Sequence, residues 1–180
     1  FGGLLCTLVS HIFLYASVRR LSGEDADLPW ELLFVFNLTL LFSGGCIIQT
    51  PDTPLRLFWT IALYGCTRVV TGGGKGGWYV AGVALGLGLL SKYTMVLMVP
   101  CMLAFLLFSP PHRHWLGRKE PYLATLLGAL IFSPVIVWNM QHGWASVAFQ
   151  LAQGFSPVGK PAVSKLLEYV GGQIGVVTPL

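Results

Sequence analysis

Residues 78–108, "WYVAGVALGLGLLSKYTMVLMVPCMLAFLLF", decide how this chain folds, because 31 residues in a row carry a single charge. One α-helix of that length would measure about 46 Å, whereas the hydrocarbon core of a bilayer is about 30 Å thick. The segment is therefore too long for one ordinary membrane crossing. We expect a hairpin of two helices that turns at "SKYT", residues 91–94, and one long crossing is the alternative.

The remainder of the chain is similarly apolar. Of its 180 residues, 54% are hydrophobic and 10% are charged, and the mean hydropathy is +0.71, which exceeds what a soluble domain normally carries. Further apolar segments occupy residues 1–18, 30–48, 55–70, 122–138 and 166–180. We therefore predict an all-α fold, a polytopic transmembrane helical bundle. Both ends of the chain lie in apolar segments, so we expect an internal fragment of about seven helical segments.

The basic residues suggest an orientation in the membrane. They are scattered between apolar segments and form no continuous stripe, so the net charge of +4 does not indicate a nucleic-acid partner. If residues 78–108 form a hairpin, one side of the membrane holds Arg19, Arg20, Arg68, Lys75, Arg113, Arg118 and Lys119. The short loops on the other side hold Arg56 and Lys92. The positive-inside rule makes the first side cytoplasmic.

This topology brings three polar stretches to the non-cytoplasmic side: "QTPDTP" (49–54), "SKYT" and "WNMQHGW" (138–144). Lys92 interrupts an apolar segment, where an ammonium group costs a few kcal/mol unless it is paired or solvated. Its natural partner is an anion, either the carboxylate of Asp52 or a phosphate at the level of the lipid headgroups. These residues are candidates for a functional site.

Asp52 and His142 each have a simpler explanation as well. Pro51 and Pro54 are expected to end one helix and begin the next, so Asp52 could cap that helix with its carboxylate, and it could do so alongside a functional role. His142 lies among tryptophans and amide side chains, where it could bind a substrate or be an incidental member of an interfacial aromatic belt.

Other patterns have structural readings. "GGGKGG" (72–77) lacks the Ser or Thr and the preceding strand of a phosphate loop, and we interpret it as a flexible connector. Cys6, Cys46, Cys66 and Cys101 lie in apolar segments and read as packed hydrophobic side chains. Val147, Ala148 and Leu151 recur at helical spacing, which predicts a short helix that either lies along the membrane interface or packs on the spans.

The chain resembles bacterial members of the dolichyl-phosphate-mannose protein mannosyltransferase family, glycosyltransferase family 39, which are related to the aminoarabinose transferase that modifies lipid A. The resemblance covers nearly all residues. Three segments carry it, in this order: "TPDTPLRLFWTIALY", "WYVAGVALGLGLLSKYTMVLMVP" and "PYLATLLGALIFSPVIVWNMQHGWASVAFQL".

The resemblance implies part of the membrane domain of a C-type glycosyltransferase in the bacterial inner membrane, with a pocket facing the periplasm. The donor would be a sugar linked to polyprenyl phosphate, and the acceptor a lipid, protein or glycan. Asp52 corresponds to a supporting acid of the pocket, Lys92 would bind the donor phosphate and His142 would contact substrate. The family's acidic base pair lies in a loop that would precede Phe1, so we expect this chain alone to be inactive.

A secondary transporter is the alternative function, because broken helices and an embedded lysine also suit an anion site near the middle of a membrane. Such a transporter should repeat its pattern in a second half, and no internal repeat is visible in the sequence. No cofactor is indicated by the residues, and assistance by a divalent metal stays open.

Overall fold

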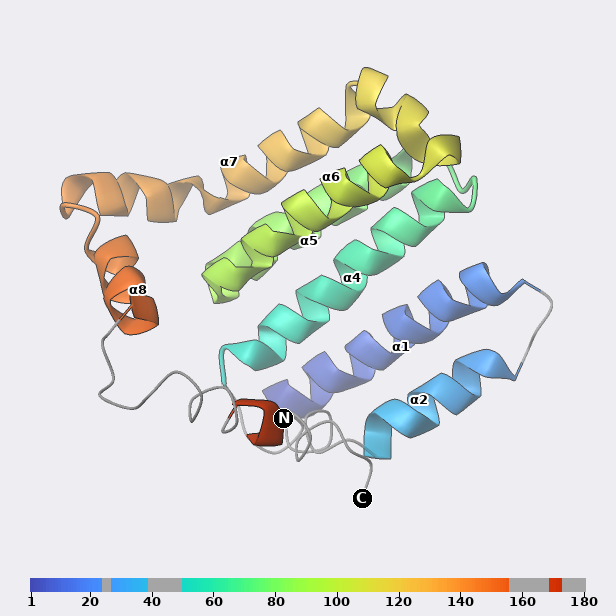
Figure 1. Ribbon diagram of the computed structural model, residues 1–180. Coiled ribbons are helices and arrows are strands. Elements are labelled where there is room, and N and C mark those ends of the chain that lie inside the picture. The colour runs from blue at the N-terminus through green and yellow to red at the C-terminus, as the bar shows by residue number, and fades with distance from the viewer. Residues whose placement is uncertain (24–26, 39–49, 156–168, 173–180) are drawn as a thin grey trace.

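The structure is a computed structural model that describes residues 1–23, 27–38, 50–155 and 169–172. Within these ranges the regular elements are all helical, which confirms the predicted all-α fold (Figure 1). The elements are α1 (Gly2–Ser22), α2 (Leu28–Leu38), α4 (Asp52–Val70), α5 (Gly76–Ser91), η1 (Tyr93–Leu97), α6 (Met98–Phe108), η2 (Pro110–Gly117), α7 (Glu120–Gln141) and α8 (Ala145–Phe155), where η denotes a 3₁₀-helix.

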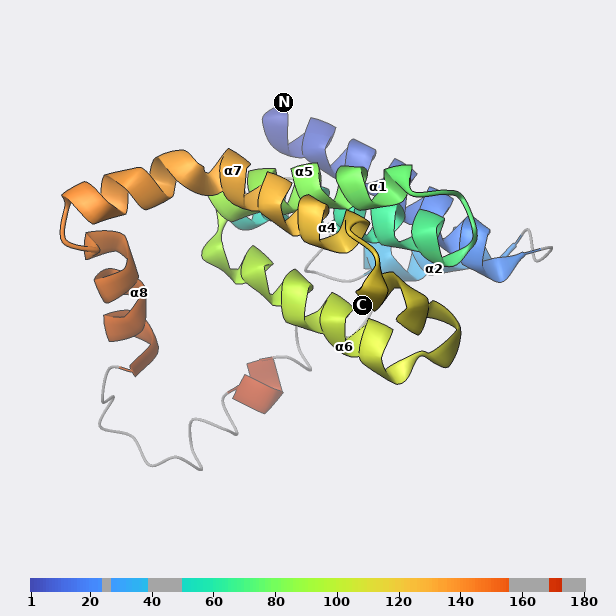
Figure 2. The same cartoon turned by 90° about the horizontal axis from the view of Figure 1, so that it is seen from above.

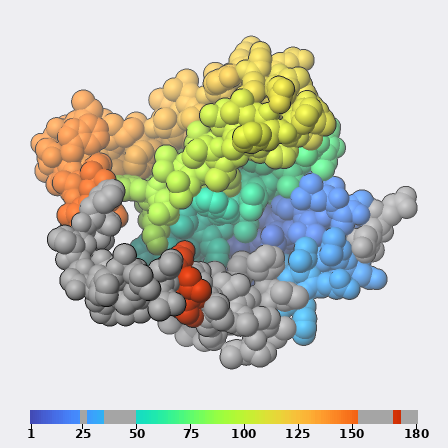
Figure 3. Space-filling model, in the orientation of Figure 1, coloured from blue at the N-terminus to red at the C-terminus, as the bar shows by residue number. Residues whose placement is uncertain are grey.

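The long helices lie side by side. Each helix in the row packs against the next, in the order α2, α1, α4, α5 and α7 (Figure 1). Neighbours along the chain run in opposite directions, because each connection reverses the chain. Seen from above, α6 diverges from this row, and η2 returns the chain to the start of α7 (Figure 2). In the space-filling view α6 and η2 cover the upper part of one face, with α4 and α1 beneath them (Figure 3).

The predicted hairpin within residues 78–108 is present. Helix α5 ends at Ser91, Lys92 has an extended backbone with φ −156° and ψ 133°, and the chain then returns through η1 and α6. Figures 1 and 2 both show the reversal, with α5 and α6 joined at one end. Met95 of η1 is fully buried, and its side chain occupies the space beside Gly88. The turn is therefore packed against α5 and holds Lys92 at the tip of the hairpin.

Glycines let α4, α5 and α7 approach each other closely. A Cβ atom placed on Gly82 would lie 2.4 Å from the carbonyl oxygen of Ala124, and one on Gly77 would meet the carbonyl oxygen of Gly65. Gly86 faces Gly128 and Ile131 in the same way. Small residues at such positions let helix backbones pack closely and gain dispersion energy, as in membrane proteins.

The packing of α1 also puts small residues inside and large ones outside. Its buried positions are Gly3, Thr7, Ser10 and Ser17, spaced along one face. Ser10 and Ser17 donate hydrogen bonds to the carbonyl oxygens of Cys6 and Phe13, each 2.7 Å away, so their hydroxyls cost little when buried. The exposed positions of α1 are largely leucine and isoleucine. An apolar exterior of this kind suits lipid and not water.

Two helices among the described residues are long and apolar enough to cross a membrane, α1 and α7. A third candidate joins Tyr93–Phe108 to Pro110–Gly117 with a bend of 118°, while α5 is apolar but has 16 residues. The predicted spans 1–18 and 122–138 are therefore confirmed as helices of sufficient length. Segment 55–70 is helical within α4, which carries Asp52, Arg56 and Arg68 and is not among the spanning candidates. Much of the predicted spans 30–48 and 166–180 lies outside the described residues.

The connection between α4 and α5 is a short glycine turn, in agreement with its reading as a connector. Gly72 and Gly74 have φ of 75° and 88°, values that favour glycine, and the amide of Gly73 donates to the carbonyl oxygen of Arg68. The turn places Lys75 at the end of the bundle where α1 also ends. This end, with Arg19, Arg68, Arg113 and Lys119, is called the basic end below.

Candidate functional site at the other end of the bundle

Asp52 and Lys92 lie at the end opposite the basic end, and two different elements position them. Asp52 is the first residue of α4, directly after Pro51, and Lys92 is the residue that separates α5 from η1. The fold brings them together from positions 40 residues apart in the sequence. Both residues thus lie at the same end of the bundle, and the side of the membrane that this end faces stays a prediction.

The two side chains form an ion pair. The Lys92 ammonium donates to Oδ1 of Asp52 in a short, charge-assisted hydrogen bond of 2.5 Å. The Lys92 side chain is 43% exposed and that of Asp52 is 59% exposed. A ligand outside the bundle can therefore contact the pair, and a charged group on that ligand would interact with Lys92 or Asp52 by Coulomb attraction.

The carboxylate of Asp52 makes no side-chain capping hydrogen bond. The N-cap residue of α4 is Pro51, which makes no side-chain capping hydrogen bond, and the amide of Thr50 donates to the hydroxyl of Thr53 over 3.5 Å. As an acid in the first turn, Asp52 still interacts favourably with the helix dipole. The capping alternative therefore does not account for the orientation of its carboxylate, which is directed to Lys92.

His142 is held by its own helix. Its Nδ1 lies 2.8 Å from the carbonyl oxygen of Trp138, and its ring stacks on the Trp138 indole with centroids 4.2 Å apart. Within the described ranges His142 forms no hydrogen bond or ion pair with Asp52 or Lys92. The structure thus joins two of the three candidate residues and leaves His142 separate, next to the turn into α8.

Asn139 determines how the chain passes from α7 to α8, a role that sequence reasoning missed. Its side chain is 2% exposed, its Nδ2 donates to the carbonyl oxygen of Val135 at 3.0 Å and its Oδ1 accepts from the amide of Ser146 at 3.1 Å. Trp144 has φ 59°, unusual for a bulky residue, and its amide donates to the carbonyl oxygen of Asn139. The signal available in the sequence was an asparagine directly after the predicted span 122–138.

The predicted helix at Val147, Ala148 and Leu151 is present as α8. Val147 is partly exposed, and so are Phe149 and Leu151. The helix touches the end of α7. Its exposed apolar side chains and its contact with α7 leave both interpretations open, a helix along the interface or a loop helix packed on the spans.

The arrangement can bind an anion. Lys92 has three ammonium hydrogens and uses one on Asp52, so an anion can bind to the others without breaking the pair. In the described part of the chain no three His, Cys, Asp or Glu side chains come close enough to hold a metal ion.

Fold and site together define a class: a helical integral membrane protein, with small residues inside, large apolar residues outside and an ion pair at one end. Comparison with known proteins gives the particular family. The chain belongs to the dolichyl-phosphate-mannose-protein mannosyltransferase family, whose model matches residues 1–138. This match confirms the resemblance that the sequence motifs suggested.

Two curated relatives come from Rhizobium johnstonii. The lipid A galacturonosyltransferase RgtD is 26% identical over 190 residues, which cover 99% of this chain and 37% of that protein. The lipopolysaccharide core galacturonosyltransferase RgtA is 26% identical over 164 residues, which cover 87% of this chain and 32% of that protein. The chain thus spans about a third of the length of these relatives. No solved structure matches it.

Proposed function

We propose that this chain is part of a membrane glycosyltransferase that moves a sugar from polyprenyl phosphate to an acceptor hydroxyl or phosphate on the periplasmic side of the bacterial inner membrane. The ion pair between Lys92 and Asp52 carries the proposal, because it places a reachable cation at the tip of an apolar hairpin. A phosphate attached to a lipid tail needs such a cation at the edge of the apolar region. Family membership supports the type of reaction.

The residues have different roles in this proposal. Lys92 binds the donor phosphate, Asp52 orients the lysine and organises the pocket, and His142 contacts the sugar or the acceptor from the end of α7. In the transfer step the bond between the anomeric carbon and the donor phosphate oxygen breaks, and a bond from that carbon to the acceptor oxygen forms. The acceptor proton passes to a base that we place outside the described residues, so Asp52 is a supporting acid.

The names of the relatives suggest an acceptor class. They are described as acting on lipid A and on the lipopolysaccharide core, and as transferring galacturonic acid. We propose a glycolipid of the bacterial envelope as the acceptor of this protein too. The sugar needs a direct test, because both relatives are only 26% identical to this chain over the aligned residues.

The proposal is tested by a transfer assay on the full-length protein in bilayers. Polyprenyl phosphate bearing labelled galacturonic acid, mannose or aminoarabinose is supplied with lipid A or lipopolysaccharide core, and the label is followed to the acceptor. Transfer from one of these donors supports the proposal. Movement of a soluble anion across the bilayer without transfer would instead support the alternative, a secondary transporter with an anion site at Lys92.

A further inference from the structure

A second feature lies toward the basic end, away from Asp52 and Lys92. A cavity of about 310 Å³ separates α6 from α5 and α7 and is closed by η2 at one end. Its walls are almost entirely apolar and include Trp78, Leu85, Met102, Leu106 and Leu116. Its volume is in the range of small-molecule pockets, and an apolar chain is the chemistry that such walls accept.

The cavity also contains a polar group without a partner. Trp78 is 4% exposed and lines the cavity, and its indole Nε1 finds no hydrogen-bond acceptor among the described residues. The Trp115 ring packs edge-on against it, with centroids 5.7 Å apart. A buried donor without an acceptor is rare in folded proteins and unfavourable. The wall of the cavity therefore holds a donor that the described residues leave unsatisfied.

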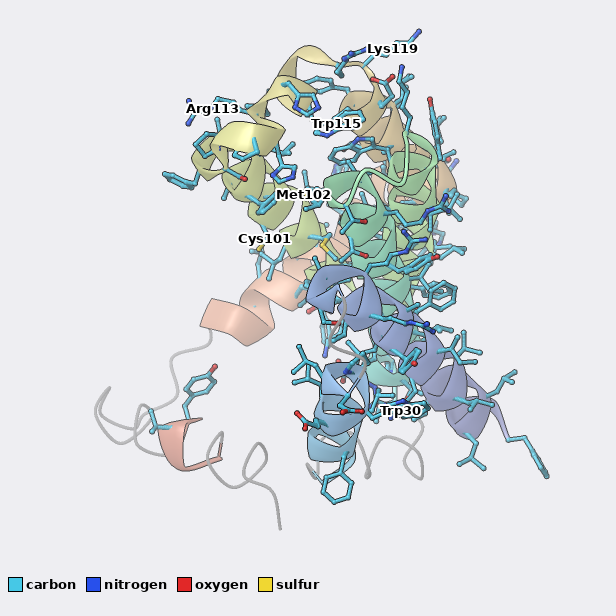
Figure 4. The ribbon with its side chains drawn as sticks, turned by 90° about the vertical axis from the view of Figure 1, so that its right-hand side faces the viewer. Trp30, Cys101, Met102, Arg113, Trp115 and Lys119 are labelled. Atoms are coloured by element: carbon cyan, nitrogen blue, oxygen red, sulfur yellow. The ribbon has the colours of Figure 1, made fainter. Side chains whose placement is uncertain are left out.

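Two cations flank the rim of the cavity. Arg118 and Lys119 follow the lining residue Leu116 and precede the lining residue Pro121, and both are exposed. Their side chains form no ion pair or hydrogen bond with any part of the chain that the structure describes. The neighbouring acid, Glu120, is buried and already paired with Lys75 at 2.8 Å. Figure 4 shows Lys119 pointing away from the bundle. The rim therefore carries a net positive charge, because among the described residues Glu120 is the one acid beside Lys75, Arg118 and Lys119.

From these observations we propose that the cavity binds an anionic phospholipid. One acyl chain lies between α5, α6 and α7 against the apolar walls, and the negative headgroup rests beside Arg118 and Lys119. Charge complementarity at the rim is what favours an anionic over a zwitterionic lipid. The bound lipid would fill the space that now separates α6 from α5 and α7. This site is independent of the donor site proposed at Lys92, because it lies toward the other end of the bundle.

The experiment uses the full-length protein in nanodiscs. Phosphatidylglycerol with a photoreactive diazirine on one acyl chain is compared with phosphatidylcholine bearing the same chain, and labelled peptides are quantified by mass spectrometry. We expect phosphatidylglycerol to label the peptides of α5, α6 and α7 that line the cavity about fivefold more strongly or better, since each basic residue near an anionic headgroup contributes about this factor.

Three variants distinguish lipid binding in the cavity from a general electrostatic attraction between the protein and anionic lipids. Lys119→Glu should reduce labelling by phosphatidylglycerol to the level of phosphatidylcholine. Arg19→Glu changes the charge of the basic end equally, on α1, which contributes no residue to the lining of the cavity, and should leave labelling unchanged. Leu103→Trp, at a lining position that is 48% exposed, should fill the cavity and abolish labelling by both lipids while the protein remains folded.

Three results would overturn the proposal. They are equal labelling by the two lipids, equal losses for Lys119→Glu and Arg19→Glu, or no labelling of the lining peptides. The last result would mean that another segment of the full-length polypeptide occupies the cavity.

Discussion

The charge of Lys92 can stabilise the fold or bind a ligand, and the free energies expected for these two roles differ. An ion pair as exposed as that with Asp52 contributes about 0.2–1 kcal/mol to stability. A charge-assisted contact to a phosphate in a partly desolvated site contributes about 1.5–3 kcal/mol to binding. Loss of the charge should therefore affect donor affinity more than the amount of folded protein.

Lys92→Met keeps the length and the apolar stem of the side chain and removes the charge. We expect the apparent KM for the polyprenyl-phosphate sugar to rise about tenfold to a hundredfold, because the phosphate is present in both ground and transition states. Lys92→Arg keeps the charge with a different geometry and should retain part of the affinity. Steady-state kinetics with varied donor concentration measure both. An unchanged KM with less folded protein would assign Lys92 to the hairpin alone.

The sequence predicted a partner for Lys92, but it could not predict the exact roles of Asp52 and His142. A lysine inside an apolar segment needs an anion, and topology put Asp52 on the same side, so their pairing could be anticipated as one of two options. The sequence could not exclude capping by Asp52, because that depends on Pro51, and not Asp52, being the N-cap residue. For His142, the spacing of four residues to Trp138 predicts a stacked pair only once α7 is known to continue to Gln141, with His142 as its C-cap residue.

Among the elements, the contact between α5 and α7 depends on glycine. Gly82→Ala would place a methyl group 2.4 Å from the carbonyl oxygen of Ala124, which forces the two helices apart. Alanine favours a helix over glycine by about 1 kcal/mol, yet overpacking costs about 1–3 kcal/mol. We therefore expect a net loss of stability, measured as a lower Tm of the full-length protein in detergent.

Gly76→Ala is the matched control for this experiment. It lies in the same helix, and a Cβ there would have no neighbour within 4 Å. Its Tm should stay the same or rise. If Gly82→Ala were as stable as Gly76→Ala, the close approach of α5 to α7 would not be a feature of the folded protein.

The hairpin was predictable because its length and its central lysine are visible in the sequence. The course of α6 was not, since it depends on Met95 filling the space beside Gly88 and on the 3₁₀ geometry of η1. Helix α4 was predicted as a span of residues 55–70, and the structure extends it to Asp52. Pro54 does not interrupt it because the first turn of a helix tolerates proline.

At the scale of the whole molecule, the two ends of the bundle should lie on opposite sides of the membrane. Cysteines at His114 and Gln141, both exposed, should react with a membrane-impermeant thiol reagent from opposite sides when introduced into a cysteine-free background. We expect labelling at Gln141 from the periplasm and at His114 only after the membrane is permeabilised. Labelling of both positions from one side would disprove the proposed orientation.

The separation of charge between the two ends follows from the sequence once the hairpin is accepted, because each reversal of the chain alternates the side of the next loop. The sequence could not predict the cavity beside Trp78. That cavity arises from the divergence of α6 from its neighbours, and residues that are distant in sequence form its walls.

The central claim, that Lys92 and Asp52 act on the substrate and not only on each other, is tested most directly by Asp52→Asn, Lys92→Met and the double variant. Donor-dependent transfer is measured for all three in the full-length protein at matched membrane levels. We expect each single variant to lose at least about tenfold in kcat/KM and the double variant to stay as impaired, because removing both charges does not restore a phosphate site. Recovery of near wild-type transfer in the double variant would contradict the account and reduce the pair to a structural ion pair.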